Sequence, residues 1–134
     1  RKAKADVVAF GKYADELLEF LGMDDISNEL ASNLPQGNLR ALGIAIGLAT
    51  DPKVLLLDEP SAGLSPKAAG ELFTTIREIA ATGVAVLLVE QNALEALDLA
   101  DRAYIFAAGQ NHSEGPAKEL AADPSIRRTF LGGH

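Results

Sequence analysis

The sequence predicts an α/β fold with parallel core strands, helices on both faces and a helical region at the N-terminus. Two short apolar runs, residues 54–57 and 84–89, do not alternate with polar residues, which is typical of strands covered on both faces. An amphipathic helical pattern at residues 66–81 lies between the two runs. A strand, a helix and a strand in this order favour a right-handed crossover, so the two strands are expected to be parallel.

Helical patterns dominate the N-terminal part of the chain, and strands and helices alternate in the rest. Gly22 is a plausible end for the first helix, and Asp51-Pro52 breaks the second, because proline disfavours helical backbone in the residue before it. The expected elements in chain order are a helix at 5–22, a polar link at 24–33, a helix at about 38–49, a strand at 54–57, a loop at 61–66, a helix at 66–81, a strand at 84–89, a helix at 93–100, a strand at 102–107, a turn at 108–109 and two short helices within 116–131. The strand at 102–107 is expected to join the parallel sheet.

The composition is that of a folded domain and excludes several function classes. The chain has 134 residues, of which 48% are hydrophobic and 23% are charged, as in ordinary folded proteins. Its net charge of -7 argues against nucleic acid as the main partner, because duplex binding needs a basic face. The sequence contains no cysteine, which excludes disulfides and thiolate metal sites within it. Its longest weakly polar stretch, residues 41–50, is too short for a membrane-spanning helix.

Asp58-Glu59, directly after the first apolar strand, is the main chemical signal in the sequence. In parallel sheets, ligands bind outside the carboxyl ends of the strands, and a strand end holds a carboxylate rigidly. In a Mg²⁺ site beside a nucleotide phosphate, the protein usually supplies one carboxylate ligand. A second carboxylate could polarise a water for attack. Taken alone, the pair fits equally well with two solvated acids at the end of a buried strand.

Two further segments accompany this pair. Leu34-Pro35-Gln36-Gly37-Asn38 opens a helix upstream, and Val89-Glu90-Gln91-Asn92 ends the second strand downstream. This combination resembles the C-terminal half of an ATP-binding cassette (ABC) ATPase, and the resemblance covers essentially the whole chain. It implies a partial P-loop NTPase fold, with a helical signature subdomain at residues 1–50 and the C-terminal part of the nucleotide-binding core at residues 51–134.

The resemblance implies a role for each residue around the first strand. Asp58 looks like the Walker B aspartate, which acts on Mg²⁺ directly or through water. Glu59 looks like the catalytic glutamate, which orients or deprotonates the attacking water. Ser61, Gly63 and Ser65 lie in a segment that resembles the D-loop at the dimer interface, with Ser65 at the usual aspartate position.

Pro35, Gln36, Gly37 and Asn38 stand in the position of the signature motif, which caps the γ-phosphate of ATP held by a partner subunit. A helix N-terminus attracts phosphate through its free N–H groups. Three of these residues depart from the usual motif: Pro35 replaces a serine and has no N–H, Gln36 replaces a glycine and Asn38 replaces a glutamine. Gly37 still permits close backbone approach. The segment is therefore either a phosphate cap or a helix start that has lost that contact.

Gln91 takes the switch position, where many members of the family have histidine. A glutamine can still hydrogen-bond a γ-phosphate but does not titrate near neutrality, so Gln91 is either a phosphate sensor or a passive residue at a strand end. The Leu-Pro-x-Gly variant at residues 34–37 and the segment 89–92 are similar to the ATP-binding subunits of branched-chain amino acid importers.

The phosphate-binding loop of such ATPases is missing from the sequence. No Gly-x-x-x-x-Gly-Lys-Ser/Thr segment occurs in the 134 residues, so we expect the chain alone to be inactive as an ATPase. Because the missing region supplies core strands, we also expect an apolar sheet face or a strand edge to be uncovered.

The resemblance further implies ATP and Mg²⁺ as cofactors. As partners it implies a second ATP-binding subunit and transmembrane permease subunits, with a place on the cytoplasmic face of the cell membrane. Two alternatives remain. One is a non-catalytic truncated cassette that acts as an interaction module on an intact partner. The other is a cassette ATPase acting on DNA, which the net charge of -7 disfavours.

Overall fold

The computed structural model describes residues 2–130, with side chains described for residues 9–129. The chain divides into two compact units, residues 1–87 and 88–134. Each unit is a group of residues that lie close to one another. This division does not test the predicted functional boundary between residues 50 and 51, which stays a prediction.

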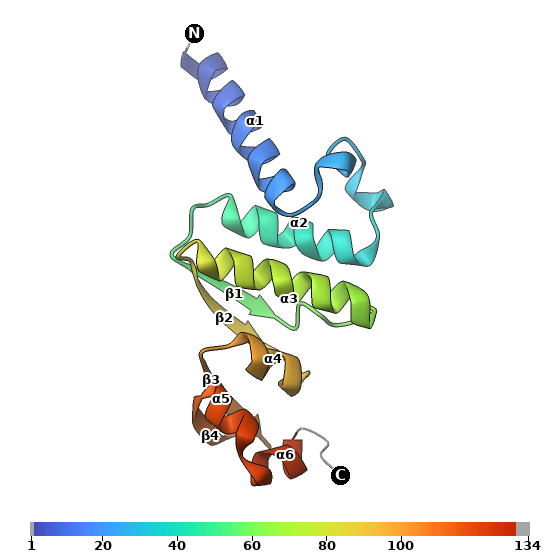
Figure 1. Ribbon diagram of the computed structural model, residues 1–134. Helices are drawn as coiled ribbons and strands as arrows, with labels where there is room; N and C mark the ends of the chain where they lie inside the picture. The colour runs from blue at the N-terminus through green and yellow to red at the C-terminus, as the bar shows by residue number, and fades with distance from the viewer. Residues whose placement is uncertain (1, 131–134) are drawn as a thin grey trace. The chain divides into compact units, whose positions relative to one another are not determined.

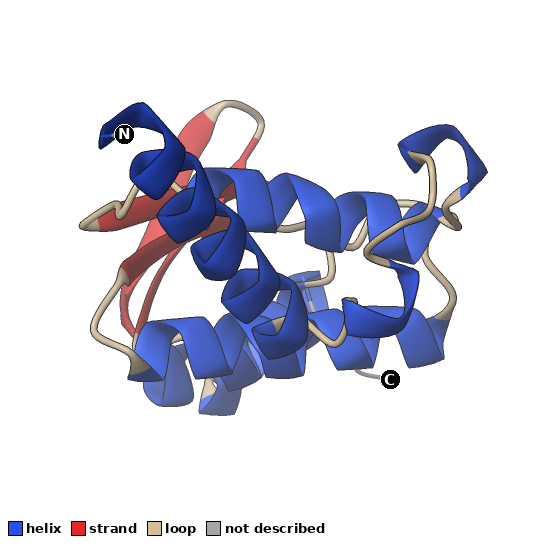
Figure 2. Ribbon diagram, turned by 90° about the horizontal axis from the view of Figure 1, so that it is seen from above, coloured by secondary structure: helices blue, strands red, loops and turns tan. Residues whose placement is uncertain are grey.

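The first unit begins with helices, as the sequence predicts. Helix α1 (Lys2–Phe20) ends before Gly22, whose φ of 64° is a left-handed conformation that glycine adopts without strain. Two short 3₁₀ turns, η1 (Asp24–Ile26) and η2 (Ala31–Asn33), form the polar link. Figure 2 looks down on this unit with α1 nearest the viewer.

Helices α2 (Gln36–Leu48) and α3 (Pro66–Ala81) run side by side in the first unit (Figure 1). Helix α3 supplies much of the core through its predicted apolar face, and the side chains of Ile76 and Ile79 are fully buried. Helix α1 is tied to α2 by the Tyr13 hydroxyl, which donates to the carbonyl oxygen of Leu48 at 3.3 Å. The start of α2 lies two residues before the predicted one.

Strand β1 (Val54–Asp58) pairs with β2 (Ala85–Val89) in a two-stranded sheet, and both strands point the same way (Figure 1). The predicted strand–helix–strand crossover is therefore confirmed. Leu55 is buried, and its Cδ1 atom lies 3.0 Å from where a Cβ on Gly47 would stand. The α2 backbone thus approaches β1 closely, which fixes the strand that leads to Asp58.

The second unit corrects one expectation about the sheet. Strand β3 (Arg102–Ala107) does not join β1 and β2 but pairs antiparallel with β4 (Gln110–Pro116). The turn between them places Ala108 and Gly109 at φ values of 49° and 75°, as in the tight turns that suit hairpins. His112 lies within β4 and is exposed. The sequence did not predict this strand because it is polar and exposed at most positions, so it carries no apolar pattern.

The rest of the second unit consists of short helices, which are α4 (Ala93–Leu99), α5 (Ala117–Ala122) and α6 (Pro124–Phe130). Of these, α5 contacts both strands of this hairpin. Their small core contains Leu97, Ala117, Leu120 and Ile126. The predicted pair of C-terminal helices is confirmed, although Leu131, the last residue of that range, lies outside the described residues.

Candidate functional site

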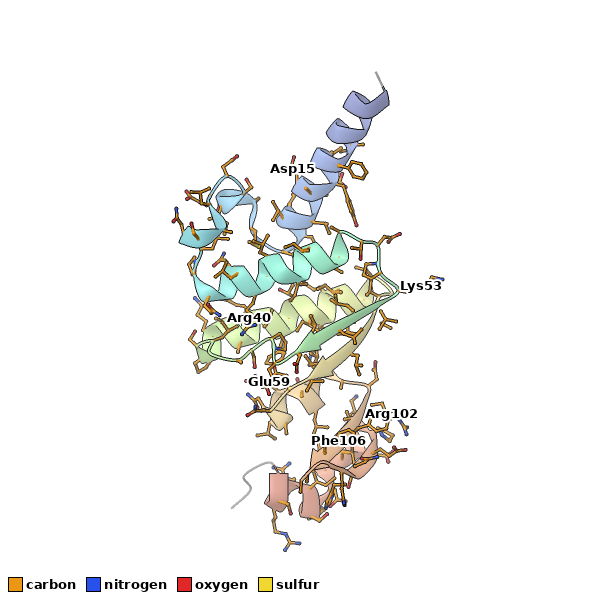
Figure 3. The ribbon with its side chains drawn as sticks, turned by 180° about the vertical axis from the view of Figure 1, so that it is seen from behind. Asp15, Arg40, Lys53, Glu59, Arg102 and Phe106 are labelled. Atoms are coloured by element: carbon orange, nitrogen blue, oxygen red, sulfur yellow. The ribbon has the colours of Figure 1, made fainter. Side chains whose placement is uncertain are left out.

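The carboxyl end of β1 carries the two predicted acidic residues. Asp58 is the last residue of the strand and is exposed, whereas Glu59 is half-buried. Figure 3 labels Glu59 beyond the strand end. Its φ is 43°, a left-handed value that is unusual for glutamate, and its carbonyl oxygen accepts a hydrogen bond from Ala62 N–H at 3.0 Å. Pro60 behind it is buried. The backbone therefore turns sharply at Glu59, so that the two neighbouring carboxylates occupy different surroundings.

The loop after β1 holds the three residues predicted to lie in a D-loop. Ser61 is half-buried, and Gly63 adopts a left-handed φ of 77°. Ser65 is the N-cap of α3: its Oγ accepts a hydrogen bond from Ala68 N–H at 3.3 Å, and Pro66 occupies the first helical turn. The Ser65 hydroxyl thus has a structural task, which its type and position before a proline could have signalled.

The start of α2 brings together the four residues of the predicted signature motif. Pro35 stands at the N-cap, and its carbonyl oxygen accepts from Leu39 N–H at 3.0 Å. Proline has no side-chain acceptor, and no side-chain hydrogen bond caps this helix. The N–H groups of Gln36, Gly37 and Asn38 therefore begin the helix without a side-chain cap.

Gly37 links this helix start to the loop after β1. A Cβ on Gly37 would lie 3.9 Å from the Cβ of Ala68, an ordinary van der Waals contact. Ala68 is the residue whose N–H is capped by Ser65. The structure therefore brings the first turn of α2, which carries Gly37, next to the first turn of α3, which Ser65 caps.

Gln91 lies in the second unit, two residues beyond the end of β2. Its side chain is exposed, and α4 begins after the following asparagine. The position at the carboxyl end of a strand agrees with the prediction. Its role as a phosphate sensor stays a prediction.

The acidic residues fit a Mg²⁺ ion that is held mainly by nucleotide oxygens and water. Among residues 9–129, whose side chains are described, no group of three or more His, Asp or Glu side chains could hold a metal by itself. Asp58 would supply one carboxylate oxygen, and Mg²⁺ near a phosphate needs little more from the protein. The described acidic residues therefore do not form a site that would hold a metal ion without a nucleotide.

Two buried polar atoms were not foreseen from the sequence. The Nε atom of Arg40, on α2, and the Oε2 atom of Glu95, on α4, are buried without a hydrogen-bond partner. Neither sequence position carries a pattern that would have revealed this. The left-handed backbone of Glu59 was also unforeseen, since glutamate gives no sign of it.

The chain is similar to known proteins over most of its length. A family model described as "AAA domain, putative AbiEii toxin, Type IV TA system" matches residues 5–89. The chain belongs to this AAA-domain family. The chain also matches the C-terminal region of ABC transporter ATP-binding proteins, as the motifs predicted. The partial ABC ATPase fold is likewise confirmed.

Three of these ABC proteins illustrate the likeness. The high-affinity branched-chain amino acid transport ATP-binding protein BraG of Pseudomonas aeruginosa is 39% identical over 120 residues, which are 89% of this chain and 52% of BraG. The lipopolysaccharide export system ATP-binding protein LptB of Haemophilus influenzae is 36% identical over 89% of this chain and 49% of its own length. The ADP conformation of MJ1267, an ATP-binding cassette of an ABC transporter, has a TM-score of 0.80 and 29% identity over 92% of this chain and 50% of its own.

The chain spans about half the length of the curated relatives it matches. None of the described helices is long and apolar enough to cross a membrane.

Proposed function

We propose that this chain is the part of an ABC transporter ATP-hydrolysing subunit that carries the catalytic carboxylates and the signature helix. The observation that supports this most is the placement of Asp58 and Glu59 at the carboxyl end of β1, in the same unit as the uncapped start of α2. Its relatives among ABC ATP-binding proteins support the same conclusion.

Each site residue then has a definite task in ATP hydrolysis. Asp58 would hold Mg²⁺ directly or through water, and a bound ion would supply positive charge that offsets the charge of the phosphates. Glu59 orients the attacking water and accepts its proton as the water oxygen bonds to the γ-phosphorus and the bond to ADP breaks. Gln91 donates its amide N–H to the γ-phosphate.

The start of α2 acts on ATP that is held by a second ATP-binding subunit. The N–H groups of Gln36, Gly37 and Asn38 face a γ-phosphate across the dimer interface, where the helix dipole favours negative charge. Ser61, Gly63 and Ser65 shape the loop that approaches the partner. The dimer in turn drives permease subunits from the cytoplasmic face of the membrane.

ATP binding requires a phosphate loop that the 134 residues do not contain. We therefore expect the chain alone to show neither ATPase activity nor measurable ATP affinity. Isothermal titration calorimetry with Mg²⁺-ATP tests this, and a micromolar site on the chain alone would overturn it. The chain joined to the preceding half of BraG should bind and hydrolyse ATP.

Branched-chain amino acids are the proposed cargo, and import is the proposed direction. BraG is named for such transport and is 39% identical, and the Leu-Pro-x-Gly start of α2 supports the same branch. LptB is named for lipopolysaccharide export at 36% identity, so the cargo needs its own test. The joined protein should restore labelled leucine uptake in P. aeruginosa cells that lack BraG. Active ATPase in those cells without leucine uptake would refute the cargo.

A non-catalytic interaction module is the second candidate. The observation that favours it is Pro35, which leaves α2 without either a side-chain cap or an N–H at that position. Such a module would bind an intact ABC subunit without adding hydrolysis. Binding of this chain to a phosphate-loop-bearing half without ATP turnover would support it over the enzyme.

A further inference from the structure

Glu59 has an unusual backbone conformation for its place in the fold. In the described part of the chain, three residues other than glycine have a left-handed φ: Asp51 at 51°, Glu59 at 43° and Ala108 at 49°. Asp51 lies in the turn that ends α2, where its N–H donates to the carbonyl oxygen of Leu48 at 2.9 Å, and Ala108 lies in the turn of the β3–β4 hairpin. Left-handed residues are common in both settings. Glu59 instead follows directly after a strand, where neither setting applies.

The left-handed conformation of Glu59 has an energetic cost. In a residue with a side chain, this conformation brings Cβ close to the following carbonyl oxygen. Such a residue persists only where its surroundings determine its backbone, and residues of this kind concentrate at active sites. The groups that hold the Glu59 backbone are therefore expected to matter for what its carboxylate does.

Pro60 holds the backbone on the C-terminal side of Glu59. The carbonyl oxygen of Glu59 accepts a hydrogen bond from Ala62 N–H at 3.0 Å, which closes a four-residue turn. Pro60 occupies the second position of this turn, where the φ that its ring imposes fits best. Its ring is also buried, whereas Asp58 on the other side of Glu59 is exposed. The turn is thus anchored to the protein through Pro60.

Pro60 also restricts Glu59 directly. The ring of a proline clashes with the residue before it when that residue adopts a right-handed helical conformation. The ring therefore disfavours the right-handed alternative at Glu59, and the hydrogen bond to Ala62 opposes an extended one. Together they leave the left-handed conformation as the one that Glu59 adopts.

We propose that Pro60 is a positioning residue for Glu59: its buried ring and the turn that it forms hold Glu59 in the left-handed conformation and so fix the direction in which the carboxylate leaves the chain. The proposal rests on the proposed function, because it takes Glu59 as the group that accepts the proton of the attacking water. A carboxylate held in place before the reaction does not have to be oriented during it, which lowers the barrier.

The first experiment measures the backbone strain in the 134-residue chain and does not depend on ATP hydrolysis. Glycine adopts a left-handed backbone freely, so Glu59→Gly should have a higher urea midpoint than Glu59→Ala. Glu71, exposed on α3, is the matched control, and there the glycine variant should have the lower midpoint.

Pro60→Ala is then added to both variants at position 59. The advantage of glycine over alanine should shrink, because the backbone at that position can now leave the left-handed conformation. A glycine advantage that Pro60→Ala does not change would show that Pro60 does not hold Glu59, and no glycine advantage in the first place would show that Glu59 is not strained.

The second experiment measures kcat and the KM for ATP in the chain joined to the preceding half of BraG. Pro60→Ala should lower kcat about tenfold or more and leave KM within about twofold, because Glu59 acts on the water and not on ATP binding. Pro52→Ala is the matched control, since Pro52 follows the left-handed Asp51 at the other end of β1, and it should leave both constants unchanged. A Pro60→Ala protein that no longer binds ATP would show a structural role and overturn the proposal.

A double variant separates this proposal from the proposed function. In a Glu59→Gln protein, adding Pro60→Ala should lower kcat no further, because the carboxylate that Pro60 positions is already gone. An equal loss with and without Glu59→Gln would refute the positioning role alone and leave the enzyme intact. If Glu59→Gln by itself left kcat at the parent value, the proposed function would fail, whereas the strain measured in the first experiment would stand.

Discussion

Two glycines of α2 offer a paired test of how the signature helix is fixed to β1. A Cβ on Gly43 would meet nothing within 4 Å, whereas a Cβ on Gly47 would lie 3.0 Å from Leu55 Cδ1. Both glycines lie inside the same helix, Gly47 one residue from its end. Alanine at Gly43 therefore adds a methyl group in open space, and alanine at Gly47 adds the same group against the core.

The two substitutions should change stability in opposite directions. Alanine in a helix interior is favoured over glycine by about 1 kcal/mol, so Gly43→Ala should raise the free energy of unfolding by about that amount. Gly47→Ala gains part of this, but inserting a methyl against a packed side chain costs about 1–3 kcal/mol. Because Leu55 is only 7% exposed and has little room to move, we expect Gly47→Ala to be about 0–2 kcal/mol less stable than the parent.

Urea unfolding followed by far-ultraviolet circular dichroism measures both changes, with the slopes compared to confirm that the unfolding reaction is the same. The contrast between the two variants reports the contact that holds β1, and thereby Asp58, against α2. Equal stabilisation by both alanines would show that α2 and β1 are not packed as described, and the placement of the carboxylates would lose its support.

Three further predictions concern local structure. Ser65→Ala removes the cap of α3 and should lower the free energy of unfolding by about 1 kcal/mol, whereas Ser32→Ala, an exposed serine in η2, should not shift the urea midpoint. The pKa of Asp123 is held below its ordinary value, first by the hydrogen bond from the Ser125 side chain. The ionised Asp123 therefore stabilises the folded chain above its unfolded-state pKa, and this stabilisation is lost as the pH falls through the lower folded-state pKa. In a circular dichroism titration, Asp123→Asn should reduce the loss of stability that acid causes. Leu97→Ala should lower the free energy of unfolding by about 2–5 kcal/mol, because Leu97 is 4% exposed in the small core of the second unit. A thermal unfolding midpoint equal to that of the parent would contradict this.

The sequence predicted most of the elements, because their signals are local. The apolar face of α3, the strand–helix–strand order and the stop at Gly22 each depend on residue type and spacing alone. The motif residues were also placed correctly at a strand end and a helix start.

The unforeseen features depend on tertiary context. Strand β4 is polar and five of its seven residues are exposed, so its pairing with β3 follows from the turn at Ala108-Gly109 and not from an apolar pattern. The left-handed backbone at Glu59 and the buried Nε of Arg40 arise from packing around those residues. The apolar run at 54–57 indicated a strand covered on both faces, and one of these faces is open within the described chain.

The rate of ATP hydrolysis by the chain joined to the preceding half of BraG tests the central claim most directly. Glu59→Gln removes the proposed proton acceptor, and Glu71→Gln makes the same change at an exposed position on α3. We expect Glu59→Gln to lower the rate constant by about 10²-fold or more while ATP binding persists, and Glu71→Gln to leave it unchanged. Equal rates for the two variants would contradict the assignment of the β1 carboxylates as the catalytic centre.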